Sequence, residues 1–288
     1  MTGAVLPAQA PSAADWRPTL PELQRRARAE NFSVASLLLG RRTARHLRAV
    51  YLYARLVDEC GDAAPGDRRF ALDRVEHELD RAFAATATDP VFRELAVAIR
   101  ACRLPREPFL RLLEANRRDQ VQKTYASYED LLGYCDLSAN PVGELVLHVF
   151  GAASADRIVL SDRICTALQL IEHWQDVRED VAAGRIYLPE EDRRAFGVAD
   201  SDLAGEHASD ALRRLLAFET ARADMLLSEG AVLVGRLRGR ARLAVAGYVA
   251  GGRAAIDAIE HADFDVLAGA PRARRLHRLL LTSTALLR

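Results

Sequence analysis

The sequence predicts an all-α fold, a bundle of helices around a central cavity. Long stretches rich in Ala, Leu, Arg and Glu repeat their apolar residues with the period of an α-helix. No segment shows the sustained alternation of apolar and polar residues that a half-buried strand requires. Apolar residues make up 50% of the 288-residue chain, which is ample material for a core. About ten helices in one chain are expected to pack as a bundle that encloses a cavity.

Breaks in this periodic pattern divide the chain into separate helices. Residues 1–18 are rich in Ala and Pro and have neither the charged nor the apolar region of a signal peptide, so we expect a flexible leader there. A single all-helical domain is expected over 19–288. Its helices are expected at 20–38, 42–61, 68–86, 90–102, 106–122, 128–138, 142–150, 156–182, 208–235, 240–262 and 273–287.

Helix ends near the two acidic motifs discussed below are marked by Gly and Pro. Gly61, followed by Pro65 and Gly66, ends the second expected helix. Gly184, followed by Pro189, ends the eighth. The stretch that then runs to residue 207 is the longest one without a helical pattern, as expected of a lid or an interface loop.

Composition and missing motifs exclude several classes of protein. The 40 basic and 40 acidic residues cancel and form no long basic block, so no nucleic-acid partner is expected. No apolar run approaches the ~18 residues that span a bilayer. The four cysteines lack Cys-x-x-Cys spacing, as expected of reduced cytoplasmic thiols. Without a nucleotide loop, zinc spacing or nucleophile elbow, nucleotide, zinc and acyl-enzyme chemistry are disfavoured.

Two Asp-x-x-x-Asp pairs are the candidate metal ligands. Asp58 and Asp62 lie at the end of one expected helix, and Asp176 and Asp180 lie near the end of another. Residues four apart share one face of a helix, ~6 Å apart along its axis, so each pair presents two carboxylates to one point. Their mutual repulsion and the negative helix end cost roughly 0.5–1.5 kcal/mol. Such oxygen ligands suit Mg²⁺ that also binds a diphosphate.

Each acidic pair also has a purely structural interpretation, because an Asp-rich chain contains such pairs by chance. Around Asp58 the same helical face carries Leu47, Tyr51 and Ala54, so the carboxylates continue an apolar row that resembles a cavity wall. The second pair shares its face with Gln169, opposite a broad apolar side. That arrangement is typical either of a cavity wall or of a face in water.

Two other segments are candidates for the site. Asn140 and Pro141 are good residues to begin a helix, and the small residues around them also permit a bulky chain to approach the backbone. Arg185 follows the second acidic pair. It either folds back over bound phosphate oxygens or compensates the negative end of its helix.

An ordered set of segments resembles the squalene/phytoene synthase family from about Glu30 to Leu267. The segments are Tyr51–Asp62, Tyr134–Gly143, Leu168–Asp180 and Gly184–Pro189. Within the family, the chain is most similar to the branch that forms hydroxysqualene in bacterial hopanoid pathways. This similarity rests on the Asn31-Phe32 pair, the Ser-Ala-Asn-Pro-Val-Gly stretch and Trp174-Gln175-Asp176. The resemblance implies an isoprenoid-synthase-type bundle in which the two acidic motifs face each other across a cavity.

The resemblance also implies a reaction: Mg²⁺-dependent conversion of presqualene diphosphate and water to hydroxysqualene and pyrophosphate. It implies that the metal ligands are Asp58, Asp62, Asp176 and Asp180. The implied catalytic or cavity-wall groups are Tyr51, Arg55, Tyr134, Gln169 and Arg185. We expect the bound substrate to be a prenyl diphosphate, either presqualene or farnesyl diphosphate.

Two departures from the family pattern, and a second type of reaction within the family, leave alternatives open. Glu172 stands where asparagine is common, and Glu59 stands where a second aspartate is common. One alternative is head-to-head condensation of two prenyl diphosphates to presqualene diphosphate, squalene or phytoene. Another is a non-catalytic, lipid-binding or scaffold protein. The basic segment Arg272–Arg278 leaves two interpretations, peripheral contact with anionic lipid at the inner membrane face or a solvated helix face.

Overall fold

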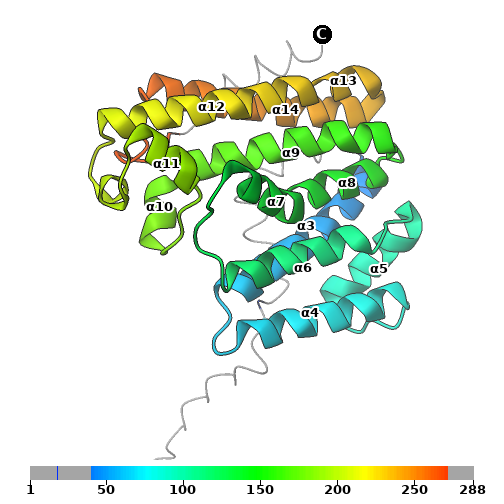
Figure 1. Cartoon of the computed structure of the whole chain (residues 1–288). Coiled ribbons are helices and arrows are strands. Elements are labelled where there is room, and N and C mark those ends of the chain that lie inside the picture. Colours follow the sequence, from blue (N-terminus) through cyan, green and yellow to red (C-terminus); the bar gives the residue numbers. More distant parts are fainter. Residues whose placement is uncertain (1–17, 19–39, 272–288) are drawn as a thin grey trace, which may run out of the picture.

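The computed structural model describes residue 18 and residues 40–271, and this part of the chain is helical without a β-strand (Figure 1), which confirms the all-α prediction. The elements are α3 (Arg41–Asp62), α4 (Arg68–Phe83), α5 (Pro90–Cys102), α6 (Glu107–Asp119), α7 (Tyr128–Ser138), α8 (Asn140–Val149), α9 (Ala155–Gln175), α10 (Val177–Ala182), α11 (Glu190–Phe196), the 3₁₀ helix η1 (Asp200–Ala204), α12 (Asp210–Gly230), α13 (Val232–Arg236) and α14 (Gly239–His261). The helices expected at 20–38 and 273–287, the leader and the Arg272–Arg278 segment lie outside the described residues.

The helices form two halves with separate apolar cores. In one half α12, α13 and α14 make a layer that packs on α9, with α7 on its other side (Figure 1). In the other half α3 packs against α4, α5 and α6. Helix α8 contacts both α9 and α3, so it joins the halves. No helix of the described part combines the length and the apolar character needed to cross a bilayer.

Side-chain caps define where several of these helices begin. The Asp67 carboxylate accepts hydrogen bonds from the backbone N–H groups of Arg69 and Phe70 at the start of α4. Ser127 and Asp130 form a reciprocal capping box at the start of α7. Each cap satisfies N–H groups that a helix leaves without an internal partner.

The helix expected at 156–182 is broken in the structure at Asp176, which is a correction to the sequence prediction. Asp176 has φ −103° and ψ 16°, between the end of α9 and the start of α10. The backbone hydrogen bonds Asp176 N–H to Glu172 O (3.0 Å) and Asp180 N–H to Asp176 O (2.8 Å) bracket the bend. Because neither Gly nor Pro lies at the break, the sequence carries no signal for it.

The region after Gly184 is also more ordered than expected, because it contains α11 and η1. Pro189 precedes α11, acidic residues fill its first turn, and Gly197 follows it with φ 71°. These are ordinary start and stop signals, but a seven-residue helix with little apolar periodicity is easily missed. The helix expected at 208–235 is divided at Ala231 into α12 and α13.

Asn140 has a different role from the helix cap predicted for it, because α8 begins at Asn140 itself and Ala139 is the capping residue. The Asn140 side chain donates to Asp136 Oδ1 (3.3 Å) and accepts from the Thr166 hydroxyl (3.0 Å). It therefore ties the junction of α7 and α8 to α9.

Candidate active site

A cavity of about 300 Å³ lies between α3, α6, α7 and the α9–α10 bend. Its lining residues are Arg55, Asp58, Asp62, Leu112, Asn116, Asp119, Tyr134, Ser138, Gln169, Glu172, His173, Asp176, Asp180, Arg185 and Tyr187. Eight of the nine predicted site residues are in this set, including all four aspartates of the two motifs. Residues separated by more than one hundred positions in the chain thus meet at one place.

Tyr51 is the predicted site residue that is not in this set. Its side chain is half-buried on α3 and packs against the apolar core shared by α3, α4, α5 and α6. The predicted catalytic role of Tyr51 therefore gains no support from the geometry of this cavity.

Arg185 joins the two acidic motifs. Its Nη1 donates to Asp62 Oδ1 at 3.0 Å, and its Nε lies 3.9 Å from Asp180 Oδ1. A backbone hydrogen bond from Ile186 N–H to Lys123 O (2.8 Å) fixes the neighbouring loop. One guanidinium group thus spans the gap between α3 and α10, so Arg185 folds back over the cavity and does not merely cap its own helix.

Asn116 holds Asp58 from the opposite helix. Its Nδ2 donates to Asp58 Oδ1 at 3.2 Å. This approach requires Gly61, because a Cβ atom there would lie 2.2 Å from Asn116 Oδ1. Gly61 lies within α3, so it does not end the helix as predicted but lets α6 approach α3.

Burial changes the electrostatics of two of these carboxyl groups. Desolvation raises the pKa of Asp58 to about 6, against the opposing effects of the Asn116 hydrogen bond and Arg55. Desolvation likewise raises the pKa of Asp119 to about 6, although the Tyr134 hydroxyl donates to Asp119 Oδ2 at 2.8 Å. Both carboxylates therefore lie where an added positive charge is strongly favoured.

Aromatic rings form one wall of the cavity. The Tyr187 ring stacks on His173 with centroids 3.6 Å apart, and Tyr134 lies 5.7 Å from Tyr187. Burial lowers the pKa of His173, although its contact with Asp180 opposes that effect. His173 is therefore expected to be neutral near pH 7, with Gln169 Nε2 3.1 Å from its Nε2.

The charge and hydrogen bonding of the lining fit a divalent cation together with an anion. Six carboxylates face the cavity against two arginines, so a diphosphate needs added cations to bind there. Asp119 Oδ1 and Ser138 Oγ are buried and have no hydrogen-bond partner in the described part of the chain. Buried polar atoms are normally paired, which indicates a polar occupant.

The acidic groups are spread around the cavity and do not form a compact cluster. Within residues 40–271, no three His, Cys, Asp or Glu side chains come close enough to hold a metal ion by themselves. This spacing suits Mg²⁺, which keeps several waters and is bound by one or two carboxylates together with substrate phosphates. The donors are hard oxygen atoms on facing helices, so the residues present fit the metal.

Asn116 and Asp119 are site residues that sequence reasoning missed. They follow Leu112 on successive turns of α6, so polar side chains continue an apolar row of that helix. The same signal marks Asp58 on α3. It was detectable on α6 as well, but Asn and Asp three residues apart match no metal-binding pattern.

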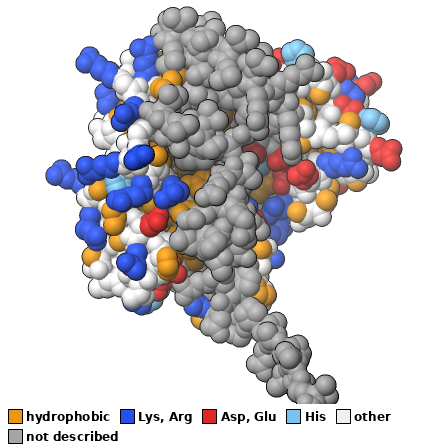
Figure 2. All heavy atoms as spheres, turned by 180° about the vertical axis from the view of Figure 1, so that it is seen from behind, with side chains coloured by type: hydrophobic (Ala, Val, Ile, Leu, Met, Phe, Trp, Pro, Cys, Tyr) orange, Lys and Arg blue, Asp and Glu red, His pale blue; other side chains and the backbone are white. Residues whose placement is uncertain are grey.

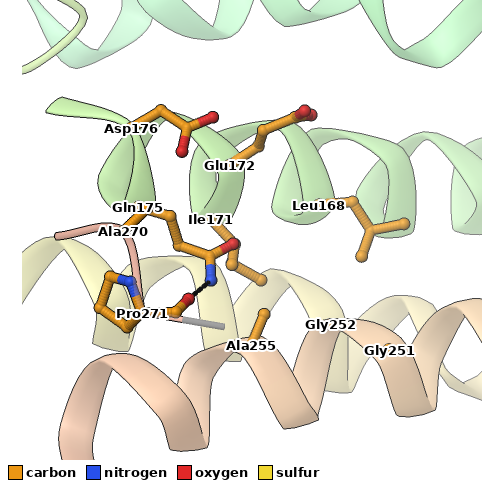
Figure 3. A pocket seen from close by; sticks show the side chains of 10 residues that line it. All are labelled: Leu168, Ile171, Glu172, Gln175, Asp176, Gly251, Gly252, Ala255, Ala270 and Pro271. Atoms are coloured by element: carbon orange, nitrogen blue, oxygen red, sulfur yellow. Dashed lines mark hydrogen bonds between the residues drawn. The ribbon is translucent and has the colours of Figure 1, made fainter. Parts of the chain in front are cut away.

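The two departures from the family pattern have different positions. Glu59 is buried and pairs with Arg55 at 2.9 Å, and it is not a lining residue. Glu172 lines the cavity and also a second one of about 360 Å³ between α9, α14 and residues 270–271 (Figure 3). In this view the carboxylates of Glu172 and Asp176 point away from Ala255 and Gly251.

The second cavity is closed at one end by the chain that follows α14. Gln175 Nε2 donates to the carbonyl of Pro271 (Figure 3), and Arg178 Nη1 donates to Leu267 O at 2.7 Å. These two residues flank Asp176, so the bend that carries the second acidic motif is attached to the segment 267–271.

The fold and this site define an all-helical enzyme of the isoprenoid-synthase type. The chain belongs to the squalene/phytoene synthase family, whose model matches residues 25–281. The match confirms the resemblance found in the sequence and identifies a prenyltransferase-type enzyme. A non-catalytic scaffold is therefore not supported.

Relatives with two different activities have about the same sequence identity to this chain. Hydroxysqualene synthase from Sinorhizobium fredii is 31% identical over 215 residues, covering 73% of this chain and 72% of the relative. Phytoene synthase from Mycobacterium tuberculosis is 32% identical over 217 residues, covering 74% of this chain and 71% of the relative.

Two crystal structures have the same fold over most of their length. Squalene synthase HpnC from Alicyclobacillus acidocaldarius is 46% identical with a TM-score of 0.80, covering 84% of this chain and 93% of that one. A dehydrosqualene synthase in complex with a ligand is 25% identical with a TM-score of 0.84, covering 91% and 93%.

Proposed function

We propose that this enzyme converts presqualene diphosphate and water to hydroxysqualene and pyrophosphate with Mg²⁺. The observation that carries the proposal is the Arg185 guanidinium between Asp62 and Asp180, because it joins the two acidic motifs at one cavity of about 300 Å³. Support for this particular reaction comes from relatives named hydroxysqualene synthase and from Gln175-Asp176, where other branches usually have Arg-Asp.

Each group in the cavity has a distinct proposed part. Asp58 and Asp62 on one wall and Asp176 and Asp180 on the other would hold Mg²⁺. When bound, Mg²⁺ supplies positive charge against the charge that develops on the leaving diphosphate. The guanidinium group of Arg185 donates hydrogen bonds to the same oxygens, as preorganised donors do at a developing anion.

The aromatic and apolar side chains act on the cation left behind. The faces of Tyr134 and Tyr187 offer negative electrostatic potential to a carbocation. Their packing with His173 keeps bulk water out, so that one admitted water is the nucleophile. Arg55, held by Glu59, and Gln169, held by His173, are proposed to orient the substrate beside this wall.

Head-to-head condensation of two prenyl diphosphates is the second candidate. The observation in its favour is that phytoene synthases match this chain as well as hydroxysqualene synthases do. Condensation would use the same acidic motifs, so the two candidates differ in substrate and product and not in metal requirement.

Product analysis separates the candidates. Purified protein is incubated with Mg²⁺ and either presqualene or farnesyl diphosphate, with and without NADPH, and the products are identified by mass spectrometry. We expect hydroxysqualene from presqualene diphosphate without NADPH and no product from farnesyl diphosphate alone. Consumption of farnesyl diphosphate alone would favour condensation, and no turnover of either substrate would overturn both candidates.

Replacing Asp176 with Asn tests the metal role within the same assay. We expect pyrophosphate release to fall by about 100-fold or more, since electrostatic groups at a reacting centre contribute that much. Glu179→Gln is the matched control, because Glu179 is exposed on α10 and lies outside the cavity lining. Circular dichroism checks that both variants keep their helical content. Full activity of Asp176→Asn would reject the role.

A further inference from the structure

Arginines from three helix ends meet at one edge of the protein, although its net charge is zero. We call this surface the basic edge. It consists of Arg41, Arg42 and Arg45 at the start of α3, Arg103 after α5, and Arg238 and Arg240 at the start of α14. All six side chains are exposed. Figure 2 shows Lys and Arg side chains gathered along the left side of the view, the side where these helix ends lie.

The three helix ends lie close together, because α3 packs along α5, with Arg48 4.0 Å from Glu94, and α14 approaches the start of α3. An added Cβ at Gly40 would lie 2.7 Å from Arg240 Nη1, so the start of α14 touches the start of α3. At the end of α5, burial raises the pKa of Cys102 and the charge of Arg42 opposes that rise. Burial, and then the charges of Arg45 and Arg42, lowers the pKa of His46. The positive potential of this edge thus acts to lower the pKa values of the neighbouring Cys102 and His46 side chains.

Residues 40–271 supply no carboxylate that neutralises the basic edge. Within the residues that the structure describes, none of its six arginines forms an ion pair. Two arginines at its margin are paired, Arg48 with Glu94 at 4.0 Å and Arg236 with Asp156 at 3.2 Å. A concentration of unpaired guanidinium groups is costly to the fold and fits an external anion.

Exposed apolar side chains flank the same edge. Val159 on α9 is 54% exposed and lies one turn after Asp156, and Val232 on α13 is 52% exposed and lies one turn before Arg236. Each valine therefore lies one helical turn from the Arg236–Asp156 pair. A nucleic acid gains little from such side chains, whereas a lipid interface accepts both guanidinium and apolar groups.

We propose that the basic edge docks the enzyme on an anionic phospholipid surface, with the arginines on lipid phosphates and the valines at the interface. The choice of partner rests on the proposed function, because a long hydrocarbon product leaves the cavity most readily into an apolar phase. Arginine suits this contact since its planar fork binds phosphate oxygens in pairs and is weakly hydrated.

Vesicle sedimentation tests the proposal with the full chain and needs no substrate. The vesicles are phosphatidylcholine alone or an equal mixture of phosphatidylcholine and phosphatidylglycerol. We expect binding to the anionic vesicles only, weakened by added salt. Each arginine near such a surface contributes on the order of fivefold to binding, so Arg41→Glu/Arg42→Glu/Arg240→Glu should bind about 100-fold more weakly.

The matched control reverses three exposed arginines elsewhere, Arg68→Glu/Arg69→Glu/Arg214→Glu. Most of the changed positions in both variants lie in first helical turns, where acidic residues are tolerated. Equal loss in the control, equal binding to neutral vesicles, or tighter binding to duplex DNA than to anionic vesicles would overturn the proposal. Pyrophosphate release in detergent should be unchanged in both variants. If no prenyl diphosphate is turned over but selective vesicle binding persists, the proposed function fails and the docking surface stands.

Discussion

Arg185 is the side chain on which the geometry of the active site depends most. Its planar guanidinium reaches Asp62 on one wall and Asp180 on the other. A lysine carries the same charge as a single point and cannot span both contacts. The same fork that joins the two carboxylates would bind phosphate oxygens once cations occupy the motifs, as we propose.

Arg185→Lys should lower kcat/KM for presqualene diphosphate by roughly 10- to 100-fold, because charge is kept but the paired geometry is lost. Arg194→Lys is the control, since Arg194 is exposed on α11 and pairs with Glu190. Steady-state pyrophosphate release measures both variants. A lysine variant as efficient as the wild type would show that Arg185 supplies charge alone.

The meeting of the four aspartates and Arg185 at one cavity could be predicted because their spacing and order are visible in the sequence. Asn116 and Asp119 could not be assigned in this way, because their contact with the site depends on how closely α6 approaches α3. That distance depends on Gly61, because the absence of a Cβ there lets the helices come close. This role cannot be inferred before the helix that packs against Gly61 is known. Sequence patterns thus identify which side chains carry chemistry better than which distant side chains support them.

The contact between α12 and α9 has a comparable tight point at Gly230. An added Cβ there would lie 2.9 Å from the backbone N of Ile164 and 2.9 Å from Leu160 O. Backbone atoms cannot yield as a side-chain end does, so the two helices would have to separate. Because α9 carries Gln169 and His173, that separation would also displace one wall of the cavity.

Gly230→Ala should lower the free energy of unfolding by about 1–3 kcal/mol, as expected for overpacking. Gly247→Ala is the matched change, because Gly247 lies inside α14 and no atom of another described element lies within 4 Å of its added Cβ position. That variant should gain up to about 1 kcal/mol from helix propensity. Urea unfolding measures both. Equal effects of the two substitutions would contradict the close approach of α12 and α9.

Helix positions were predicted well where apolar periodicity is long, as in α3, α5 and α14. The break between α9 and α10 was missed because it arises from tertiary contacts. Gln175 and Arg178 donate hydrogen bonds to backbone carbonyls of the segment after α14. Neither of these long-range bonds can be predicted from the residues around the break. The helix break lies at Asp176, in the lining of the cavity. Predictions from local sequence are expected to fail most often at such functional sites.

Away from the cavity, one buried acidic group links the stability of the fold to pH. Glu219 on α12 is fully buried and faces Asp192 and Arg222, with Tyr128 beside them. Desolvation, followed by the Asp192 contact, raises the pKa of Glu219 from 4.5 to about 8, against the charge of Arg222. The Glu219 carboxyl therefore keeps its proton in the folded protein up to a higher pH than in the unfolded chain.

This difference predicts the direction of the pH dependence. Below pH 4.5 the carboxyl is protonated in both states and costs nothing. Between pH 4.5 and about 8 the Glu219 carboxyl ionises in the unfolded chain but not in the folded protein, so the free energy of unfolding falls as pH rises. Above about pH 8 the carboxyl is ionised in both states, and the lost free energy is not regained. Glu219→Gln should remove this loss, giving the variant roughly 3–5 kcal/mol over the wild type in the alkaline range.

Urea unfolding at about pH 5 and about pH 9 measures the difference, with Asp224→Asn on the exposed side of α12 as the control. The control should follow the wild type at both values. A wild-type protein that loses no more stability than Glu219→Gln over this range would show that Glu219 is ionised in the fold.

The arrangement of the two halves agrees with the proposed need for added cations. Helix α3 brings one acidic pair from the N-terminal half, and the α9–α10 bend brings the other from the C-terminal half. Neither half alone presents more than part of the proposed ligand set. A diphosphate bound with its cations would therefore join the halves, and binding should raise the stability of the fold.

Titration calorimetry of inorganic pyrophosphate, with and without Mg²⁺, tests this central claim without any turnover. We expect binding only when Mg²⁺ is present. Asp58→Asn and Asp176→Asn should each abolish most of it, and the double variant should be little worse than either one. Pyrophosphate that binds equally well without Mg²⁺, or to a variant lacking one of the two acidic pairs, would contradict a shared cation site across the cavity.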